Sequence, residues 1–223
     1  MQINNYIILR IKIFFLYYFM SSIIIVLAKA PILGEVKTRI GKNIGMDRSK
    51  WIYEQLISHT SNVTKKTKIM TVLFKNKNNE KLENLFKHSI KSKLQLGENL
   101  GEKMANAFQW AFKKKYKKIV LIGTDLWTLN EKIISDSFKL LDKCDLVIGP
   151  SYDGGYFLIG MKNLDENIFK NIPWSTNNVL EKTILKIKDR KISFLEIAKD
   201  IDSFSDVKSN LSLLKKYNKK FMF

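Results

Sequence analysis

Three cationic side chains and a glycine lie in the segment that follows the first predicted strand. Residues 28–39 read AKAPILGEVKTR, in which Lys29, Lys37 and Arg39 are the cations and Gly34 is the glycine. Cations of this kind pair with phosphate oxygens, and a glycine lets the backbone approach a ligand closely. The Gly-Lys-Ser/Thr order of a Walker loop is absent. The segment indicates either a polyphosphate-binding loop or a basic surface turn.

Two acidic segments occur later in the chain. Asp125 ends the run GTD after an apolar stretch. A carboxylate at such a strand end either holds Mg²⁺ or Mn²⁺ against phosphate oxygens or caps the following turn. In DIDSFSD at 200–206, Ser203 and Asp206 fit a helix capping box, which accounts for both structurally but leaves Asp202 without a capping role.

A glycine-rich run and a short Pro-Trp segment complete the set of candidate site residues. The run GPSYDGGY at 149–156 predicts either a plain hairpin turn or a loop that presents backbone amides and Asp153 to a substrate. The segment PWST at 173–176 precedes a predicted helix that Ser175 would cap. Trp174 belongs either to the core or to the wall of a pocket.

Strand and helix patterns alternate from Met20 onward without a long linker or a repeat. Apolar runs predict strands at about 23–28, 69–74, 93–96, 119–122, 145–148, 156–161 and 192–196. Helical spacing predicts helices at about 47–61, 80–87, 101–114, 131–141 and 175–188, with another after Ser203. Such alternation predicts an α/β fold, a three-layer α/β/α sandwich with a mostly parallel central sheet. Ligands of such sheets bind beyond the carboxyl ends of the strands, where these segments lie.

Composition narrows the class of protein. The 223 residues carry 39 Lys and Arg against 21 Asp and Glu, a net charge of +18, which raises the possibility of a basic nucleic-acid-binding or non-catalytic protein. Only four residues are arginine, the side chain best suited to bidentate contacts with bases, so no specific nucleic-acid partner is expected. Cys144 is the single cysteine, which excludes an internal disulfide, and no Ser-His-acid arrangement is readable.

The first residues form an apolar extension. The stretch from Ile13 to Ala28 carries no charge and resembles a signal peptide, but its second half is better explained as a buried strand. The run is short for a spanning helix, so no stable membrane insertion is expected. We predict that residues 1–20 are not part of the fold and form either an upstream extension or a weak membrane-associating tail. We also predict a single domain at 21–223 and a cytoplasmic protein.

The order of these motifs resembles that of a bacterial family. The segments AKAPILGEVKTRI, LGEKM, GTD, GPSYDGGYFLIG, PWST and DIDSFSDV, which span about residues 22–210, are together similar to the DUF2064 family, also called the radical-SAM/selenodomain-associated transferase 1 family. The resemblance implies the fold of the nucleotide-diphospho-sugar transferases, known as GT-A. Two departures stand out: Leu126 and Trp127 replace the family's Cys-Pro after the metal-binding Asp, and 203–205 read Ser-Phe-Ser in place of Thr-Pro-Glu.

The resemblance also implies roles for individual residues. Asp125 and Asp202 would be the ligands of Mg²⁺ or Mn²⁺, and Asp125 and Asp153 the catalytic carboxylates. The nucleotide and its phosphates would be bound by Ala28, Lys29, Ala30, Gly34, Lys37 and Arg39. The acceptor pocket would be lined by Gly154, Gly155, Tyr156, Trp174, Ser175 and Thr176.

The function expected from these residues is transfer from an activated nucleotide. A divalent ion and three cations would stabilise the negative charge that develops on a departing phosphate. We expect a metal-dependent glycosyltransferase that uses a nucleotide-sugar donor and a small-molecule acceptor. The alternative on the same fold is a nucleotidyltransferase of the guanylyl or cytidylyl type that acts on a small phosphorylated acceptor.

Overall fold

A seven-stranded sheet forms the centre of the protein. The computed structural model describes residues 21–221, so the predicted extension at 1–20 lies outside the described residues. The strands follow the order β3-β2-β1-β4-β6-β5-β7 across the sheet. Their bounds are Ser22–Ala28 (β1), Met70–Lys75 (β2), Lys91–Leu94 (β3), Lys118–Ile122 (β4), Leu146–Pro150 (β5), Tyr156–Met161 (β6) and Ile192–Phe194 (β7).

Six of the seven strands run in the same direction. The pairs β1/β2, β1/β4, β2/β3 and β5/β7 are parallel, whereas β6 is antiparallel to both β4 and β5. The reversal follows from the short glycine-rich connection between β5 and β6, because a parallel return would need a crossover of a dozen or more residues. The prediction of a mostly parallel sheet is confirmed, and β1, β4 and β5 end at the same edge.

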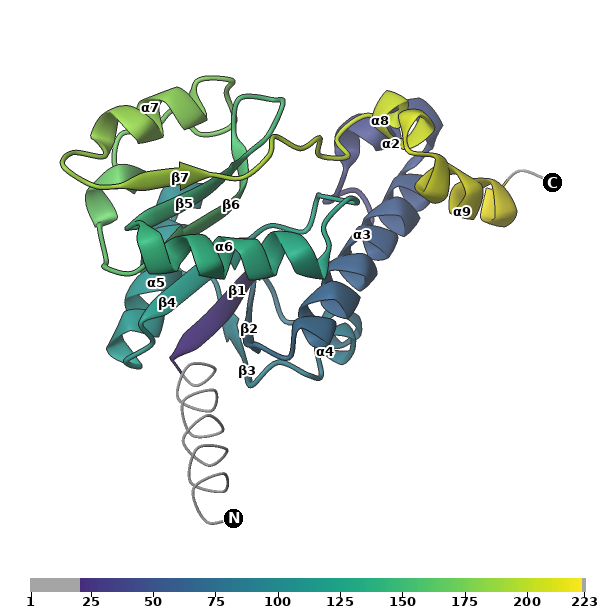
Figure 1. Ribbon diagram of the computed structural model, residues 1–223. Helices are drawn as coiled ribbons and strands as arrows, with labels where there is room; N and C mark the ends of the chain where they lie inside the picture. Colours follow the sequence, from purple (N-terminus) through teal and green to yellow (C-terminus); the bar gives the residue numbers. More distant parts are fainter. Residues whose placement is uncertain (1–20, 222–223) are drawn as a thin grey trace, which may run out of the picture.

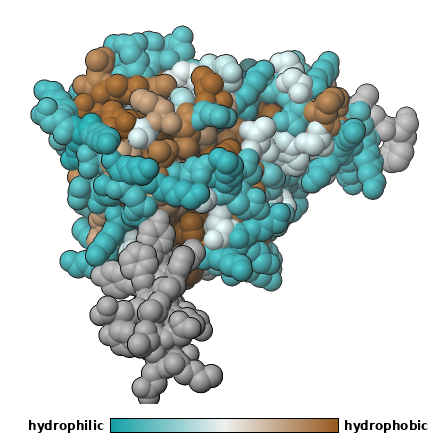
Figure 2. Space-filling view, in the orientation of Figure 1, coloured by the Kyte–Doolittle hydropathy of each residue, from teal (hydrophilic) through white to brown (hydrophobic). Residues whose placement is uncertain are grey.

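Helices cover both faces of the sheet (Figure 1). One face carries α3 (Met46–Thr67), α4 (Glu80–Leu85) and α6 (Glu131–Lys143), and the other carries α5 (Leu100–Lys113), the 3₁₀ turn η1 (Glu166–Phe169) and α7 (Val179–Lys186). This arrangement is the predicted three-layer sandwich. Figure 2 shows hydrophilic side chains over α6 at the front and an apolar area above it, toward β7.

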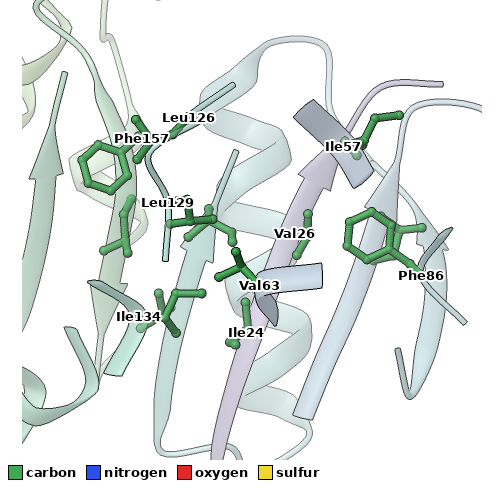
Figure 3. Close-up of a cluster of buried hydrophobic side chains, with 14 of the residues drawn as sticks. Ile24, Val26, Ile57, Val63, Phe86, Leu126, Leu129, Ile134 and Phe157 are labelled. Atoms are coloured by element: carbon green, nitrogen blue, oxygen red, sulfur yellow. The ribbon is translucent and has the colours of Figure 1, made fainter. Parts of the chain in front are cut away.

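The apolar runs of the sequence form the core because their side chains alternate between the two faces. In β1, Ile24 and Val26 pack toward α3 and α6, while Ile23 and Ile25 pack toward α5. All four are fully buried. Figure 3 shows Ile24 and Val26 among side chains of the first cluster, which include Val63 of α3. A strand buried on both faces explains the continuous β-branched run of the sequence.

A third apolar cluster packs the C-terminal helices against the helices that follow β1. It joins α2 (Thr38–Ile44) and α3 to α8 (Phe204–Ser209) and α9 (Leu211–Phe221). Trp127 belongs to this cluster, and its indole Nε1–H donates to Ser212 Oγ at 2.6 Å. The residue that departs from the family pattern at this strand end therefore anchors α9.

The helix predictions differ from the structure in four places. The helix α2 was not expected, α3 continues to Thr67 instead of ending near residue 61, and two helices replace the single one expected after Ser203. The helix predicted from residue 175 begins only at Val179, so Ser175 is not its cap. Among residues 21–221, no helix is long and apolar enough to cross a membrane.

Candidate active site

A cleft of about 670 Å³ opens at the carboxyl ends of β1 and β4, beside the first residues of β6. Its volume falls in the range of small-molecule sites. Of the predicted site residues, Ala30, Gly34 and Gly154 are not among the residues that line it. The others all line the cleft: Ala28, Lys29, Lys37, Arg39, Asp125, Asp153, Gly155, Tyr156, Trp174, Ser175, Thr176 and Asp202.

Two carboxylates in the cleft share one ammonium group. Lys37 Nζ lies 2.7 Å from Asp125 Oδ1 and 2.8 Å from Asp202 Oδ1. The side chain of Lys37 is only 6% exposed, whereas those of Asp125 and Asp202 are 45% and 42% exposed. The three side chains that the sequence placed in a phosphate loop and in two distant acidic segments therefore meet at one point.

The backbone explains how Asp202 reaches Asp125. The amide of Ile201 donates to the carbonyl oxygen of Asp125 at 3.0 Å, and the buried Ile201 side chain packs in the third apolar cluster. The predicted capping box is confirmed at the start of α8. Asp206 Oδ2 accepts from the amides of Asp202 and Ser203, which sets the direction of the chain just before the helix.

The electrostatics favour a charged Lys37. Burial by itself would lower the pKa of Lys37, but attraction from Asp125 and Asp202 outweighs burial and holds the pKa above its ordinary value. Lys37 also has a left-handed backbone with φ of 46°, which is uncommon for a residue other than glycine. The ammonium therefore stays charged between the two carboxylates.

The loop after β1 is fastened to the protein through its backbone. Tyr53 Oη accepts from the amide of Lys29 at 2.9 Å and lies 3.2 Å from Thr124 Oγ1, so it links the ends of β1 and β4. Burial, with a contribution from Asp125, raises the pKa of Tyr53 to about 12, so the phenol stays protonated. The amide of Ala30 donates to Asn76 Oδ1 at 2.7 Å. These two amides are therefore occupied within the protein and are not free to contact a ligand.

The phosphate-loop prediction changes in two details. Ala30 is buried and serves to hold the loop, and Gly34 lies at an exposed turn with φ of 77°. Gly34 is needed for that turn and is not placed for close approach of the backbone to the cleft. The exposed side chains of Lys29 and Arg39 line the cleft.

Asp200 is a third carboxylate near the pair, and the sequence analysis did not select it. Its Oδ2 accepts from Ser151 Oγ at 3.1 Å, and its Oδ1 is buried without a hydrogen-bond partner among the described residues. Burial, together with repulsion from Asp125, Asp153 and Asp202, raises the pKa of Asp200 to about 7. The alternation of Asp200 and Asp202 around the buried Ile201 is the pattern that could have identified it.

The β5–β6 loop presents Asp153 to the cleft. Asp153 Oδ1 accepts from the amide of Gly155 at 2.9 Å, which leaves Oδ2 for other partners. Gly154 adopts φ of 84°, and a Cβ atom there would lie 2.0 Å from Asn177 O. Gly154 thus permits the close packing of this loop against residue 177, although it does not line the cleft itself.

An aromatic wall closes one side of the cleft. Trp174 packs directly on Gly101 at the start of α5, where an added Cβ atom would lie 2.6 Å from Trp174 Cζ2. Tyr156 meets the Trp174 ring edge-on, with the ring centroids 6.5 Å apart. Leu100 and Met104 of α5 line the same cleft. Trp174 therefore contributes to a pocket wall and packs against the second apolar cluster as well.

Ser175 belongs to a turn that lies before α7. Thr176 Oγ1 donates to the carbonyl of Pro173 at 2.7 Å, and Ser175 has a left-handed backbone with φ of 66°. The turn occupies the four residues that had been expected to start the helix. Lys37 and Ser175 are thus two non-glycine residues of the cleft with a left-handed backbone. Residues in such sparsely populated conformations cluster at functional sites.

The carboxylate pair fits a divalent cation. Its two oxygens already converge on a single cation, and Mg²⁺ takes one or two carboxylates with its other ligands from water and phosphates. Within residues 21–221 no group of three or more His, Cys, Asp or Glu side chains is arranged to hold a metal ion. A divalent ion at Asp125 and Asp202 would therefore need oxygen ligands from a bound phosphate or from water.

A family model assigns the chain. The model of DUF2064, described as an uncharacterized protein conserved in bacteria, matches residues 60–176, more than half of the chain. The chain belongs to the DUF2064 family. The matched region of this DUF2064 protein includes Asp125, Asp153 and Trp174, whereas Lys37 and Asp202 lie outside it. Among curated proteins, none matches the sequence.

Solved structures support the fold of this DUF2064 chain. A protein of Desulfovibrio desulfuricans G20, provisionally named a nucleotide-diphospho-sugar transferase, is 24% identical with a TM-score of 0.77, over 88% of this chain and 98% of the other. The 4-diphosphocytidyl-2C-methyl-D-erythritol synthase of Anaerococcus prevotii is 10% identical with a TM-score of 0.60, over 89% and 99%. A CMP:2-keto-3-deoxy-manno-octonic acid synthetase complexed with CTP is 7% identical with a TM-score of 0.56, over 88% and 99%. These similarities establish a fold of the GT-A type.

Proposed function

We propose that this DUF2064 protein is a metal-dependent glycosyltransferase that takes a nucleotide-sugar donor. The observation that carries the proposal is the convergence of Asp125 and Asp202 on one cation, at the mouth of a cleft that Lys29 and Arg39 also line. The neighbours of known fold support a nucleotide as the ligand, since one is named for nucleotide-diphospho-sugars and another was solved with CTP.

The charge balance of the cleft supports a requirement for a metal. Its basic residues are Lys29, Lys37 and Arg39, whereas its acidic residues are Glu35, Asp125, Asp153, Asp200 and Asp202. Asp200 is only partly ionised at neutral pH because its pKa is about 7, and Glu35 pairs with Lys77, which does not line the cleft. The cleft is therefore close to neutral in a chain whose net charge is +18. A nucleotide diphosphate would add negative charge beside Asp125, Asp153 and Asp202, so a divalent cation at that point would favour its binding. The carboxylates of the cleft also argue against a nucleic-acid backbone as its ligand.

The chemistry follows from the placement of the groups. The metal, held by Asp125 and Asp202, would stabilise the negative charge of the diphosphate leaving group. Lys29 and Arg39 would bind its outer oxygens. Asp153, whose Oδ2 has no partner within the β5–β6 loop, would accept the proton of the acceptor hydroxyl as its oxygen bonds to the sugar carbon and the bond to the diphosphate breaks. Asp200 is less suited to this step, because one of its oxygens is buried and the other is bound to Ser151.

The acceptor would lie against the aromatic wall of Tyr156 and Trp174. This wall offers an apolar face and no cation, so it favours an acceptor with a hydroxyl group and an uncharged face. A phosphorylated acceptor, which the nucleotidyltransferase alternative requires, would meet Asp153 there without a partner for its charge.

The product of turnover tests the proposal. The purified protein is incubated with Mg²⁺ and a panel of nucleotide sugars, and in parallel with nucleoside triphosphates plus sugar phosphates, and products are followed by ³¹P NMR. We expect slow release of a nucleoside diphosphate from one nucleotide sugar, with water as the acceptor. Pyrophosphate formed from a triphosphate would instead establish the nucleotidyltransferase alternative and overturn our assignment.

A further inference from the structure

Lys37 contacts the two carboxylate oxygens that a metal ion at this site would need. Its Nζ lies within 2.8 Å of one oxygen from each carboxylate of the pair. Mg²⁺ lies about 2.1 Å from its oxygen ligands. An ion that bound both oxygens would therefore lie within about 5 Å of the ammonium.

The burial of Lys37, Asp125 and Asp202 shows from which side the ammonium and a metal ion would each approach the two carboxylates. Lys37 is almost fully buried, and both carboxylates are nearly half exposed to the cleft. The ammonium thus approaches from the protein side, while a metal ion would approach from the cleft. The backbone of Lys37 immediately precedes α2, whose Ile40 is fully buried in the third cluster, so the attachment of the side chain is fixed.

The charges at the Asp125–Asp202 pair disfavour binding of the Lys37 ammonium and a divalent ion at the same time. The pair and the ammonium carry a net charge of −1, which is a stable arrangement. Addition of a divalent ion beside the ammonium would place like charges within a few ångströms of each other, and their repulsion is strong in a partly buried site. A phosphate group bound at Lys29 and Arg39 would offer the ammonium other oxygens, since all three side chains line one cleft.

We propose that Lys37 is the resident cation of the Asp125–Asp202 pair, and that a divalent ion binds well only when phosphate draws the ammonium away from it. The inference rests on the metal site of the proposed function and deepens it. Metal and nucleotide would bind together, and the free protein would hold metal weakly. Lys37 is then a positioning residue that links metal binding to the arrival of phosphate.

The size of the effect follows from a population argument. Apparent affinity is reduced by the fraction of molecules in which the site is free to bind. If the ammonium occupies the pair in about nine molecules of ten, its removal raises the affinity for Mn²⁺ about tenfold.

The test measures Mn²⁺ alone, without nucleotide, by the electron paramagnetic resonance of the free ion. The variant Lys37→Met keeps the length of the side chain and removes the charge, and Lys37→Gln serves as a second variant if Lys37→Met does not fold. The matched control is Lys29→Met, because Lys29 lines the same cleft, whereas the ion pairs of both carboxylates within residues 21–221 are with Lys37. The double variant Lys37→Met/Asp202→Asn tests whether the gain arises at the pair.

We expect Lys37→Met to bind Mn²⁺ about tenfold more tightly than the parent protein, Lys29→Met to change little, and the double variant to lose the gain. A merely structural role of Lys37 would weaken binding and could not strengthen it. Equal, measurable binding by the parent and Lys37→Met would overturn the inference and leave the metal site intact. An equal gain in the Mn²⁺ affinity of Lys29→Met would show a general effect of removing positive charge from the cleft. That result would also overturn the inference about Lys37. Absence of binding in a folded Lys37→Met protein would contradict the metal site of the proposed function itself.

Discussion

The amide of Ile201 donates a hydrogen bond of 3.0 Å to the carbonyl oxygen of Asp125. This bond joins the end of β4 to the segment before α8, and Ile201 is buried at 2% exposure among the helices that cover this end of the sheet. It places the residue after Ile201 beside Asp125, so that one ammonium reaches both carboxylates. The candidate site therefore depends on a backbone contact as much as on the acidic residues.

Replacement of Tyr53 by Phe should loosen the loop after β1. The phenol oxygen accepts from the amide of Lys29 and contacts Thr124 Oγ1, and the variant leaves that amide without its acceptor. We expect a loss of about 1–2 kcal/mol in the free energy of unfolding, measured by urea denaturation. The control is Tyr116→Phe, whose hydroxyl makes only a weak contact of 3.9 Å with Met70 Sδ. A Tyr53→Phe protein as stable as the control would contradict the linking role of the phenol.

Substitution of Gly101 by Ala should displace Trp174. A helical glycine usually gains stability on change to alanine, by up to about 1 kcal/mol. At Gly101 the new Cβ atom would lie 2.6 Å from Trp174 Cζ2 and 2.7 Å from the carbonyl oxygen of Phe169. We expect a net loss of about 1–3 kcal/mol in calorimetric unfolding. Gly123→Ala is the control, because an added Cβ atom there meets nothing within 4 Å. Stabilisation by Gly101→Ala would show that Trp174 does not pack on this helix.

His59 should make a contribution to stability that is lost in mild acid. Burial lowers the pKa of His59, whose Nε2 lies 2.8 Å from the carbonyl oxygen of Leu129. Lys66 and Lys216 disfavour and Glu131 favours the charged ring. At this residue the unfolded chain takes up a proton at a higher pH than the folded protein, so the contribution of His59 to stability decreases as the pH falls through the ordinary histidine pKa of about 6.5.

The variant His59→Gln isolates this effect. Its amide can still donate to Leu129, but it does not titrate. In urea denaturation between pH 8 and pH 5 (that is, about 1.5 units on each side of the ordinary histidine pKa), we expect the stability of the parent protein relative to that of the variant to fall as the pH falls. His88 shifts in the same direction and Asp200 in the opposite one, and both are present in the two proteins, so both cancel from the difference. Parallel stability curves would refute a half-buried, neutral His59.

The core of the fold could be predicted because its signals are local. The continuous run Ile23–Val26 can hardly be anything other than a strand buried on both faces, and Tyr156–Met161 was predicted with its observed bounds. The predicted start of α7 was wrong because the Thr176 hydroxyl donates to the carbonyl of Pro173 and forms a turn. This turn competes with a helix in the same four residues. The helix α2 was missed because its stability comes from Ile40 packing against α3 and α8.

The site was only partly predictable, because several of its contacts join residues that are distant in sequence. Asp125, Asp153 and Trp174 stand in recognisable motifs, and they do line one cleft. The hydroxyl of Tyr53 is a single polar group on an otherwise apolar helix face. Its role in the site depends on contacts with Lys29 and Thr124, which are distant in sequence. The placement of Lys37 between two carboxylates likewise depends on the packing of α2 against α8, which no local pattern records.

The central claim is that Asp125 and Asp202 bind a divalent ion together with a nucleotide, and metal-dependent thermal stabilisation tests it most directly. Melting temperatures are recorded for the parent protein, Asp125→Ala and the exposed-site control Lys143→Ala, with nucleoside mono-, di- and triphosphates and nucleotide sugars, each with and without Mn²⁺. A ligand present at about a hundred times its Kd should raise the melting temperature by roughly 5–10 °C. We predict this rise for the parent and for Lys143→Ala only when Mn²⁺ and nucleotide are both present, and its absence in Asp125→Ala. An equal rise in Asp125→Ala, or a rise that does not depend on Mn²⁺, would contradict the account.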